Sequence, residues 1–211
     1  MNSNLALFKQ IAAFLAQQMQ DCEFVIHDLS NLERSIVYIC NGHISGRTVG
    51  DSATDLVLRV LKDKEYKTKD YTDIYKSVSA AGKVFNSSTF FIKQDDELVG
   101  LLCINQDLTN YQNMFDALGG ILGIADKQVP ASAAVSERLV PSVSSLPTNV
   151  IEEVFNKRVS NVTRLTKDER LEVIKELDKK GIFLLKGSIT EVAKTLKVSD
   201  ATMYRYLQMI K

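Results

Sequence analysis

Five polar or cationic side chains near the start of the chain could bind a small molecule: His27, Asn41, His43, Ser45 and Arg47. Four of them lie in or beside a glycine-containing loop, residues 43–50, where backbone N–H groups can also converge. Arg47 could pair bidentately with a carboxylate. His27 and Asp28 are neighbours on a predicted strand, so their side chains leave by opposite faces and cannot both line one pocket. Alternatively, Asn41 only turns the chain while His43 and Arg47 hydrogen-bond nearby carbonyls, and both interpretations remain open.

The same stretch holds the residue types of a nucleophilic triad, Asp28, His43 and Ser45, but Ser45 lies in no G-x-S-x-G elbow. The sequence has no P-loop, no dinucleotide fingerprint and no zinc-ligand spacing. The three cysteines are far apart inside apolar strands, which indicates buried thiols in a reducing cytoplasm. We therefore predict no catalytic residue, no cofactor and no metal, and expect that the protein is not an enzyme.

A second candidate site lies at the other end of the chain, where apolar residues recur at helical spacing on both sides of a turn at residues 197–199. Ser188 with Glu191 predicts a capping box for the first helix, and Ser199 predicts a cap for the second. Once the apolar side is turned inward, the second helix presents short, hydrogen-bonding or cationic side chains that suit the DNA major groove. The predicted DNA-binding residues are Ser199, Asp200, Ala201, Thr202, Tyr204, Arg205 and Gln208, and Lys211 points to the same side.

An ordinary helical hairpin with a solvated polar face is the alternative, and one residue counts against DNA binding. Lys197 occupies the turn position where helix-turn-helix units usually have glycine, and a positive φ there would cost about 1 kcal/mol. Charge favours DNA binding. From residue 161 onward eleven basic and seven acidic residues give +4, so the rest of this formally neutral chain carries −4. Because +4 is modest for one copy, tight binding to DNA would need at least a dimer.

The elements that must position these residues follow from hydrophobic periodicity. We predict a helix ending near Met19, strands over residues 22–28, 35–40, 84–93 and 98–105, and a helix over residues 111–126. A further helix begins after a cap at Asp51 or Ser52 and buries Leu56, Val57, Val60 and Leu61. The inner side of the helix over residues 111–126 comprises Met114, Phe115, Leu118, Ile121, Leu122 and Ala125.

The predicted strands are apolar on both faces, so helices, and possibly a partner subunit, must cover each side of an antiparallel sheet. All three prolines of the 211 residues fall in residues 127–147, which indicates a linker. Thr166 with Glu169 predicts a capping box for a supporting helix that ends at Gly181. The fold class is α+β: a PAS-like antiparallel sheet flanked by helices in residues 1–126, and a small all-α helix-turn-helix domain in residues 148–211.

Several long motifs resemble a known family. IHDLS at residues 26–30, NGHISGRTVGD at 41–51 and TDL at 54–56 resemble the YheO-like PAS family. The run from Leu165 to Leu207 resembles the helix-turn-helix domain of the same DauR-like regulators. The resemblance implies a bacterial transcriptional regulator with an N-terminal PAS-like sensor domain.

The expected function is a cytoplasmic, ligand-responsive transcriptional regulator that binds operator DNA as a homodimer or higher homo-oligomer. Its expected partners are double-stranded DNA and an unidentified small-molecule effector. No apolar run is long enough to cross a bilayer and no export signal is recognised. The alternative is a small-molecule-binding or catalytic PAS-like protein whose C-terminal helices mediate protein contacts.

Overall fold

The computed structural model describes residues 3–123, 135–139 and 165–210. The chain divides into two compact units, which we treat separately. The first unit combines residues 1–52 with residues 65–141, and the second combines residues 53–64 with residues 142–211. The α+β class is confirmed, with the sheet in the first unit and helices in the second. None of the described helices is long and apolar enough to cross a membrane.

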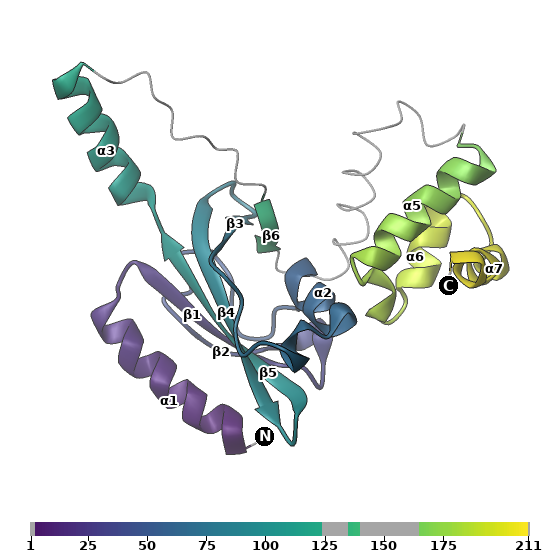
Figure 1. Cartoon of the computed structure of the whole chain (residues 1–211), viewed down its shortest axis with the longest axis horizontal. Helices are drawn as coiled ribbons and strands as arrows, with labels where there is room; N and C mark the ends of the chain where they lie inside the picture. Colours follow the sequence, from purple (N-terminus) through teal and green to yellow (C-terminus); the bar gives the residue numbers. More distant parts are fainter. Residues whose placement is uncertain (1–2, 124–134, 140–164, 211) are drawn as a thin grey trace. The chain divides into compact units, whose positions relative to one another are not determined.

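The first unit is built on one six-stranded sheet with the order β2-β1-β5-β4-β3-β6 (Figure 1). Its strands are β1 (Cys22–Asp28), β2 (Ile36–Cys40), β3 (Tyr75–Ser79), β4 (Val84–Gln94), β5 (Glu97–Asp107) and β6 (Val135–Leu139). Neighbouring strands are antiparallel except β3 and β6, which are parallel. The sheet is therefore mixed, whereas the sequence predicted an antiparallel one. The predicted strands correspond to β1, β2, β4 and β5.

Two strands were not predicted: β3 forms a hairpin with β4 through polar side chains, and β6 pairs with a distant part of the chain. β3 reads YKSVS and lacks a clear apolar alternation, but Ser77 Oγ bonds Ser87 Oγ of β4 at 2.6 Å and Lys76 Nζ bonds Asn86 Oδ1 at 2.6 Å. β6 lies inside residues 127–147, predicted as a linker, and pairs with the edge that β3 exposes. There Leu139 is buried against Ile44 and Phe85. Residues 148–164, the start of the predicted helix-turn-helix domain, lie outside the described residues.

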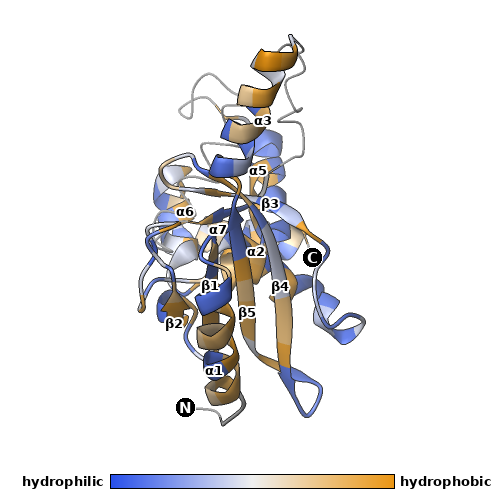
Figure 2. Cartoon of the chain, turned by 90° about the vertical axis from the view of Figure 1, so that its left-hand side faces the viewer, coloured by the Kyte–Doolittle hydropathy of each residue, from blue (hydrophilic) through white to orange (hydrophobic). Residues whose placement is uncertain are grey.

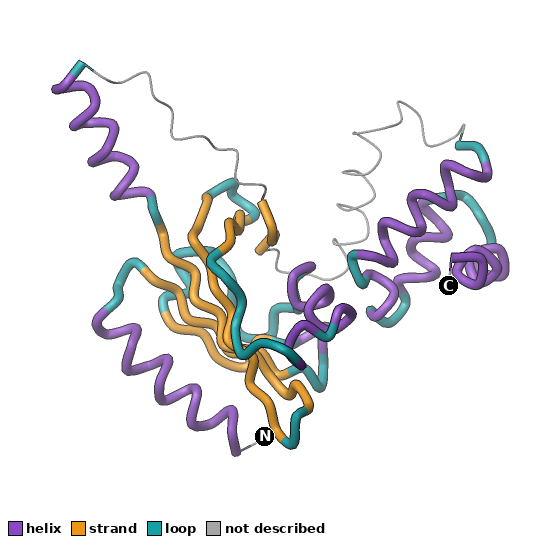
Figure 3. Tube along the Cα trace, viewed as in Figure 1, coloured by secondary structure: helices purple, strands orange, loops and turns teal. Residues whose placement is uncertain are grey.

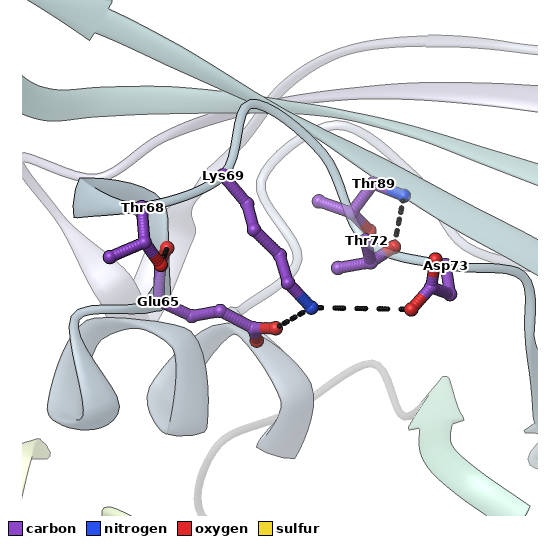
Figure 4. A network of polar contacts seen from close by, with 6 residues as sticks. All are labelled: Glu65, Thr68, Lys69, Thr72, Asp73 and Thr89. Atoms are coloured by element: carbon purple, nitrogen blue, oxygen red, sulfur yellow. Dashed lines mark hydrogen bonds and ion pairs between the residues drawn. The ribbon is translucent and has the colours of Figure 1, made fainter.

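The segment before β3 is attached to β4 by backbone and side-chain bonds. Thr72 N donates to Thr89 O at 2.9 Å, and Thr89 N donates to Thr72 Oγ1 at 3.0 Å. The short helix η2 (Glu65–Lys67) leads into this segment, and Lys69 Nζ lies 2.8 Å from Glu65 Oε1 and 4.0 Å from Asp73 Oδ2 (Figure 4). Exposed ion pairs of this kind contribute little stability, so the bonds to Thr89 do most to fix the entry to β3.

Helix α1 (Ser3–Gln18) covers one face of the sheet (Figure 1). Leu5 and Ala12 of α1 pack on Phe24, Ile26 and Leu102. Successive strand residues point to opposite faces, so Glu23, Val25 and His27 of β1 point away from α1. The η1 helix (Leu32–Arg34) forms the connection from β1 to β2.

Helix α3 (Thr109–Leu122) departs from the prediction for residues 111–126. It ends at Gly123 in the left-handed conformation, and Ala125 and Asp126 lie outside the described residues. The side chains predicted as its inner side are exposed: Met114, Phe115, Leu118, Ile121 and Leu122. The helix extends beyond the end of the sheet, so the described residues of its own unit do not cover this face (Figure 3).

The second unit contains α2 (Asp55–Asp63), α5 (Lys167–Lys179), η4 (Ile182–Leu184), α6 (Ser188–Thr195) and α7 (Asp200–Ile210). Helix α2 falls inside the predicted sensor domain but groups with the C-terminal helices, where Lys62 Nζ lies 2.5 Å from Asp178 Oδ2. Its cap is Thr54 rather than Asp51 or Ser52, because the Asp51 carboxylate accepts from Thr48 N and stabilises the loop instead. Leu56, Val57, Leu58 and Val60 are buried, while Leu61 is half-buried.

Helix caps of α5, α6 and α7 agree with the sequence in two of three cases. The capping box of Thr166 with Glu169 is confirmed, and so is the Ser199 cap, whose Oγ accepts from Thr202 N at 3.2 Å. The predicted box of Ser188 with Glu191 is wrong. Ser188 is buried and donates to Leu185 O at 2.9 Å, so Gly187, at φ 78°, is the residue that precedes α6.

Candidate functional site

A row of polar side chains crosses the sheet on the face opposite α1, and this is the chemically richest part of the first unit. The strand register aligns Glu23 of β1, Asn105 of β5, Ser87 of β4 and Tyr75 of β3. Asn105 Nδ2 donates to Glu23 Oε1 at 2.8 Å, and Ser87 Oγ donates to Asn105 Oδ1 at 2.8 Å. Glu23, Ser87 and Asn105 are buried. This face therefore combines a buried polar row with buried apolar side chains, among them Val25, Phe85 and Leu101, where the strand sequences predicted an apolar face.

The loop after β2 adds two groups to this buried polar row. Ser45 Oγ donates to Glu23 Oε2. Arg47 is 3 % exposed and donates from Nη2 to Ser52 O at 2.5 Å, while its Nε has no hydrogen-bond partner among the described residues. Buried donors are nearly always satisfied in folded proteins. The Arg47 guanidinium therefore offers a free donor inside the unit.

Burial sets the protonation of the carboxyl group in the row. Burial raises the pKa of Glu23, while hydrogen bonds from Ser45 and Asn105 and the positive charge of Arg47 oppose that rise. A carboxylate held in this way accepts hydrogen bonds at a site shielded from water. It pairs readily with a ligand that brings its own donors.

A second set of buried groups adjoins the row at β3 and β4. Tyr75 OH lies 2.9 Å from Thr89 Oγ1, and Thr89 Oγ1 donates to Cys103 Sγ at 3.4 Å. Burial first, and then the negative charge of Glu137, raise the pKa of Cys103 to about 12 and the pKa of Tyr75 well above its usual value. The Cys103 thiol therefore stays protonated and is a poor nucleophile.

Of the five predicted ligand-binding residues, the structure places Ser45 and Arg47 near the buried polar row. Asn41, at φ 55°, turns the chain and donates to Cys22 O at 2.8 Å, and His43 is exposed. His27 Nδ1 bonds Ser35 Oγ at 2.8 Å, and burial, followed by the charge of Arg47, lowers the pKa of His27 well below its usual value. The His27 ring is thus a neutral core group.

The sequence analysis did not place five further residues near the loop that holds Ser45 and Arg47: Glu23, Asn105, Ser87, Thr89 and Tyr75. The sequence indicates them only weakly, as polar residues at alternate positions within otherwise apolar strands. Asp28, His43 and Ser45 do not form a triad, because Ser45 bonds Glu23 while His43 is exposed. Among the described residues, no three His, Cys, Asp or Glu side chains are placed to hold a metal ion.

In the second unit, α7 packs its apolar side inward and leaves its polar side exposed. Met203 and Tyr206 are buried, as are Val192 and Ala193 of α6 and Val173, Ile174 and Leu177 of α5. Of the predicted DNA-binding residues, Thr202 is half-buried, and the others are exposed: Ser199, Asp200, Ala201, Tyr204, Arg205 and Gln208. Lys211 lies outside the described residues.

The first turn of α7 is fixed by side-chain bonds. Ser199 Oγ lies 2.9 Å from Thr202 Oγ1, and Asp200 Oδ2 accepts from Thr190 Oγ1 of α6 at 2.9 Å. The turn between the helices has Lys197 at φ 52°, the left-handed conformation that usually requires glycine at this position. Two short helices joined by this turn and supported by α5 are the geometry of a helix-turn-helix unit, with α7 in the position of the groove-reading helix.

Known proteins share both units. A family model for the YheO-like PAS domain matches residues 1–122, and a model for an HTH domain matches residues 147–208. YheO of Escherichia coli strain K12 is 31 % identical over 195 residues, which cover 90 % of this chain and 77 % of YheO. An uncharacterized protein of Haemophilus influenzae is 30 % identical over 212 residues, which cover 100 % of this chain and 90 % of that protein.

The transcriptional regulator DauR of Pseudomonas aeruginosa is 25 % identical over 200 residues, which cover 90 % of this chain and 85 % of DauR. The family models match the regions that carry the buried polar row and the exposed side of α7. They also confirm the resemblance seen in the sequence motifs. The chain therefore belongs to the YheO-like PAS family and carries that family's PAS domain together with an HTH domain.

Proposed function

We propose that this protein is a transcriptional regulator that binds double-stranded DNA through α7 and changes its DNA affinity when a small molecule binds at the buried polar row. The observation that carries the proposal is the exposed polar side of α7, which combines a capped helix start with Thr202, Arg205 and Gln208. Similarity to the transcriptional regulator DauR supports the same role. The combination of a PAS domain with an HTH domain also supports a regulator.

The exposed side of α7 has groups that can bind phosphate and groups that can recognise bases. The start of α7, with its free N–H groups and the Ser199 hydroxyl, suits a phosphate oxygen. Arg205 can bond guanine O6 and N7 in a bidentate manner, and Gln208 can bond adenine N6 and N7. Arg205 is exposed and has no hydrogen bond or ion pair with the other described residues. Its guanidinium is therefore available to a base edge.

The test compares variants of Arg205 on duplexes selected from a random-sequence pool with the full-length protein. Arg205→Ala is expected to weaken binding by about 1–3 kcal/mol and to relax preference at one base position. Arg205→Lys keeps the charge but not the planar fork, so it is expected to retain salt-dependent affinity and lose the base preference. Lys175→Ala, which removes an exposed cation on α5, is the matched control.

Fluorescence anisotropy at several salt concentrations is the measurement. Affinity should fall steeply as salt rises, because the protein displaces counterions from the phosphates. Affinity that does not depend on salt would contradict DNA binding and favour the alternative, in which the C-terminal helices mediate protein contacts. Equal effects of Arg205→Ala and Lys175→Ala would contradict the assignment of α7.

Sensing is proposed from the buried polar row. A ligand that carries both donors and acceptors could bond Glu23, Ser45 and the free Nε of Arg47. Mass spectrometry of small molecules retained by the purified protein identifies candidates, and each is then tested for a change in DNA affinity. A compound that binds yet leaves the affinity for DNA unchanged in wild type is not the effector.

We further propose that the protein works in the cytoplasm as a dimer or higher oligomer. The residues from 161 onward carry only +4. Because a phosphate-binding surface gains affinity with each neutralised phosphate, two joined copies bind far more tightly than one. Two helix-turn-helix units related by a two-fold axis also match a palindromic site.

A further inference from the structure

Six large apolar side chains of α3 are exposed, and they are arranged in a regular pattern. Tyr111, Phe115, Leu118 and Leu122 follow one another at spacings of four, three and four residues, which is the spacing of the a and d positions of a coiled coil. Met114 and Ile121 flank this line on one side. We call these six residues the α3 stripe. Its members include Met114 at 65 % exposed, Leu118 at 56 % and Ile121 at 81 %.

The α3 stripe is too apolar to remain in water without a reason. Contiguous exposed apolar patches of this kind mark surfaces that another molecule covers. An isolated helix of 14 residues is only marginally stable in water, and the consecutive Gly119 and Gly120 lower its intrinsic propensity further. Packing against a partner is what would keep α3 helical along its whole length.

Only the first turn of α3 is anchored by hydrogen bonds to the sheet. Tyr111 OH donates to Asp21 Oδ2 at 2.9 Å, and Asp107 Oδ1 accepts from Thr109 N at 3.0 Å. Beyond this turn the helix runs away from the strands, and the colour of its ribbon changes from hydrophilic at the base to hydrophobic toward the far end (Figure 2). The direction of α3 is thus set by the sheet, while the α3 stripe is left open.

We infer that the α3 stripe is the surface through which two copies of this chain pair, with the α3 helices parallel and in contact. This inference rests on the proposed function, because it supplies the dimer that DNA binding requires. Two features of the helix support a second copy as the occupant. The positions that flank a and d are uncharged, namely Gln112, Met114, Gly119 and Ile121. The charges that select a different partner at these positions in mixed coiled coils are therefore missing.

The second feature is the direction in which the chain continues after α3. The second unit follows α3 along the chain, so parallel pairing brings the continuing chains of both copies to the same end of the paired helices. Such an arrangement suits two half-sites on one duplex. A second apolar stripe, Leu7, Ile11 and Phe14 of α1, is also exposed in this unit. It follows the same spacing of four and three residues.

The test is the oligomeric state of the full-length protein without DNA, measured by sedimentation velocity. Wild type is expected to be a dimer. Leu118→Glu places two carboxylates opposite each other in the apolar contact and is expected to raise the dimer dissociation constant on the order of a hundredfold. Asn113→Glu adds the same charge on the outward side of α3 and is the matched control. Circular dichroism checks that both variants keep their secondary structure.

A second measurement does not depend on weakening the protein. Leu118→Cys is expected to form a disulfide-linked dimer under mild oxidation, whereas Asn113→Cys is not. A monomeric wild type, a Leu118→Glu variant that dimerises like wild type, or equal cross-linking of the two cysteine variants would each overturn the inference. Because these measurements use no DNA, they can fail while the Arg205 experiment succeeds, and the reverse.

Discussion

Replacing Lys197 by glycine is expected to relieve about 0.5–1 kcal/mol of backbone strain in the second unit, measured against alanine at the same position. Lys197 has φ 52°, and the chain leaves α6 there through bonds from Lys197 N to Lys194 O at 3.2 Å and from Val198 N to Ala193 O at 3.0 Å. This pattern is a Schellman motif, whose left-handed residue is usually glycine. An L-residue in that conformation costs about 1–2 kcal/mol, and glycine returns about 0.5–1 kcal/mol of this as extra entropy lost on folding.

The Lys197 side chain itself contributes little to the comparison. It is exposed, and it has no hydrogen bond or ion pair with the other described residues. Its charge favours the C-terminal end of α6 by about 0.3–1 kcal/mol, which both glycine and alanine remove. Lys197→Ala therefore keeps the strain without the charge, so the difference between the glycine and alanine variants isolates the backbone conformation. That difference is expected to be about 0.5–1 kcal/mol, with Lys197→Asn between them.

Amide hydrogen exchange in α6 and α7 is the suitable assay, because it reports the free energy of opening of this unit alone. Amide exchange is expected to be slowest in the glycine variant, intermediate in the asparagine variant and fastest in the alanine variant. Equal exchange in the glycine and alanine variants would refute the argument from the positive φ angle. DNA affinity should fall equally in both variants, since both lose one cation near the DNA-binding side.

Two further predictions concern the first unit. Because burial raises the pKa of Glu23 above its unfolded value near 4.5, the stability this group contributes is present below pH 4.5 and is lost as pH rises through the raised native value. In urea unfolding, the free energy of unfolding of Glu23→Gln should therefore rise relative to that of wild type as the pH increases from the unfolded to the native pKa of Glu23. A difference that stays constant at all pH values would contradict this. A Cβ on Gly100 would lie 2.6 Å from His27 O and 2.5 Å from Leu5 Cδ2, so Gly100→Ala is expected to cost about 1–3 kcal/mol. An unchanged melting temperature would show that β1 and β5 can move apart.

The parts of the fold that the sequence predicted are those whose residues specify them locally. β1 was predicted with its observed bounds because its apolar run ends in turn residues on both sides. β3 and β6 were missed because their stability comes from other strands. Ser77 bonds Ser87, and Leu139 packs on Phe85. The partners of β6 lie far away in the sequence, and β3 pairs with the neighbouring β4 through polar side chains that give no apolar alternation.

The candidate small-molecule site was predicted in part for a similar reason. Ser45 and Arg47 stood out as polar residues in a glycine-containing loop. Glu23 and Asn105 did not, because a polar residue within a strand is equally consistent with a side that faces water. Their burial becomes apparent only when the register of β1 on β5 aligns the two side chains.

Helices α3 and α7 show what hydrophobic periodicity can and cannot predict. Both carry an apolar stripe, but on α7 the stripe is covered by α5 and α6, whereas on α3 it is exposed. The pattern predicts which side of a helix is apolar and gives no information about what covers it. For α3, the way the helix leaves the sheet indicates that a second copy covers its apolar side. The same part of the unit connects the proposed ligand site with the proposed dimer contact.

The buried polar row and α3 are linked through the ends of the same two strands. Asn105 lies on β5, four residues before α3 begins at Thr109. On the other strand, Asp21 immediately precedes β1 and bonds both Gln106 of β5 at 3.0 Å and Tyr111 of α3 at 2.9 Å. A ligand that draws Glu23 toward itself therefore acts on the pair of strands whose ends set the direction of α3. Since pairing through the α3 stripe depends on that direction, we expect ligand binding to change the dimer dissociation constant of wild type, and we expect Tyr111→Phe, which removes only the bond to Asp21, to reduce that change.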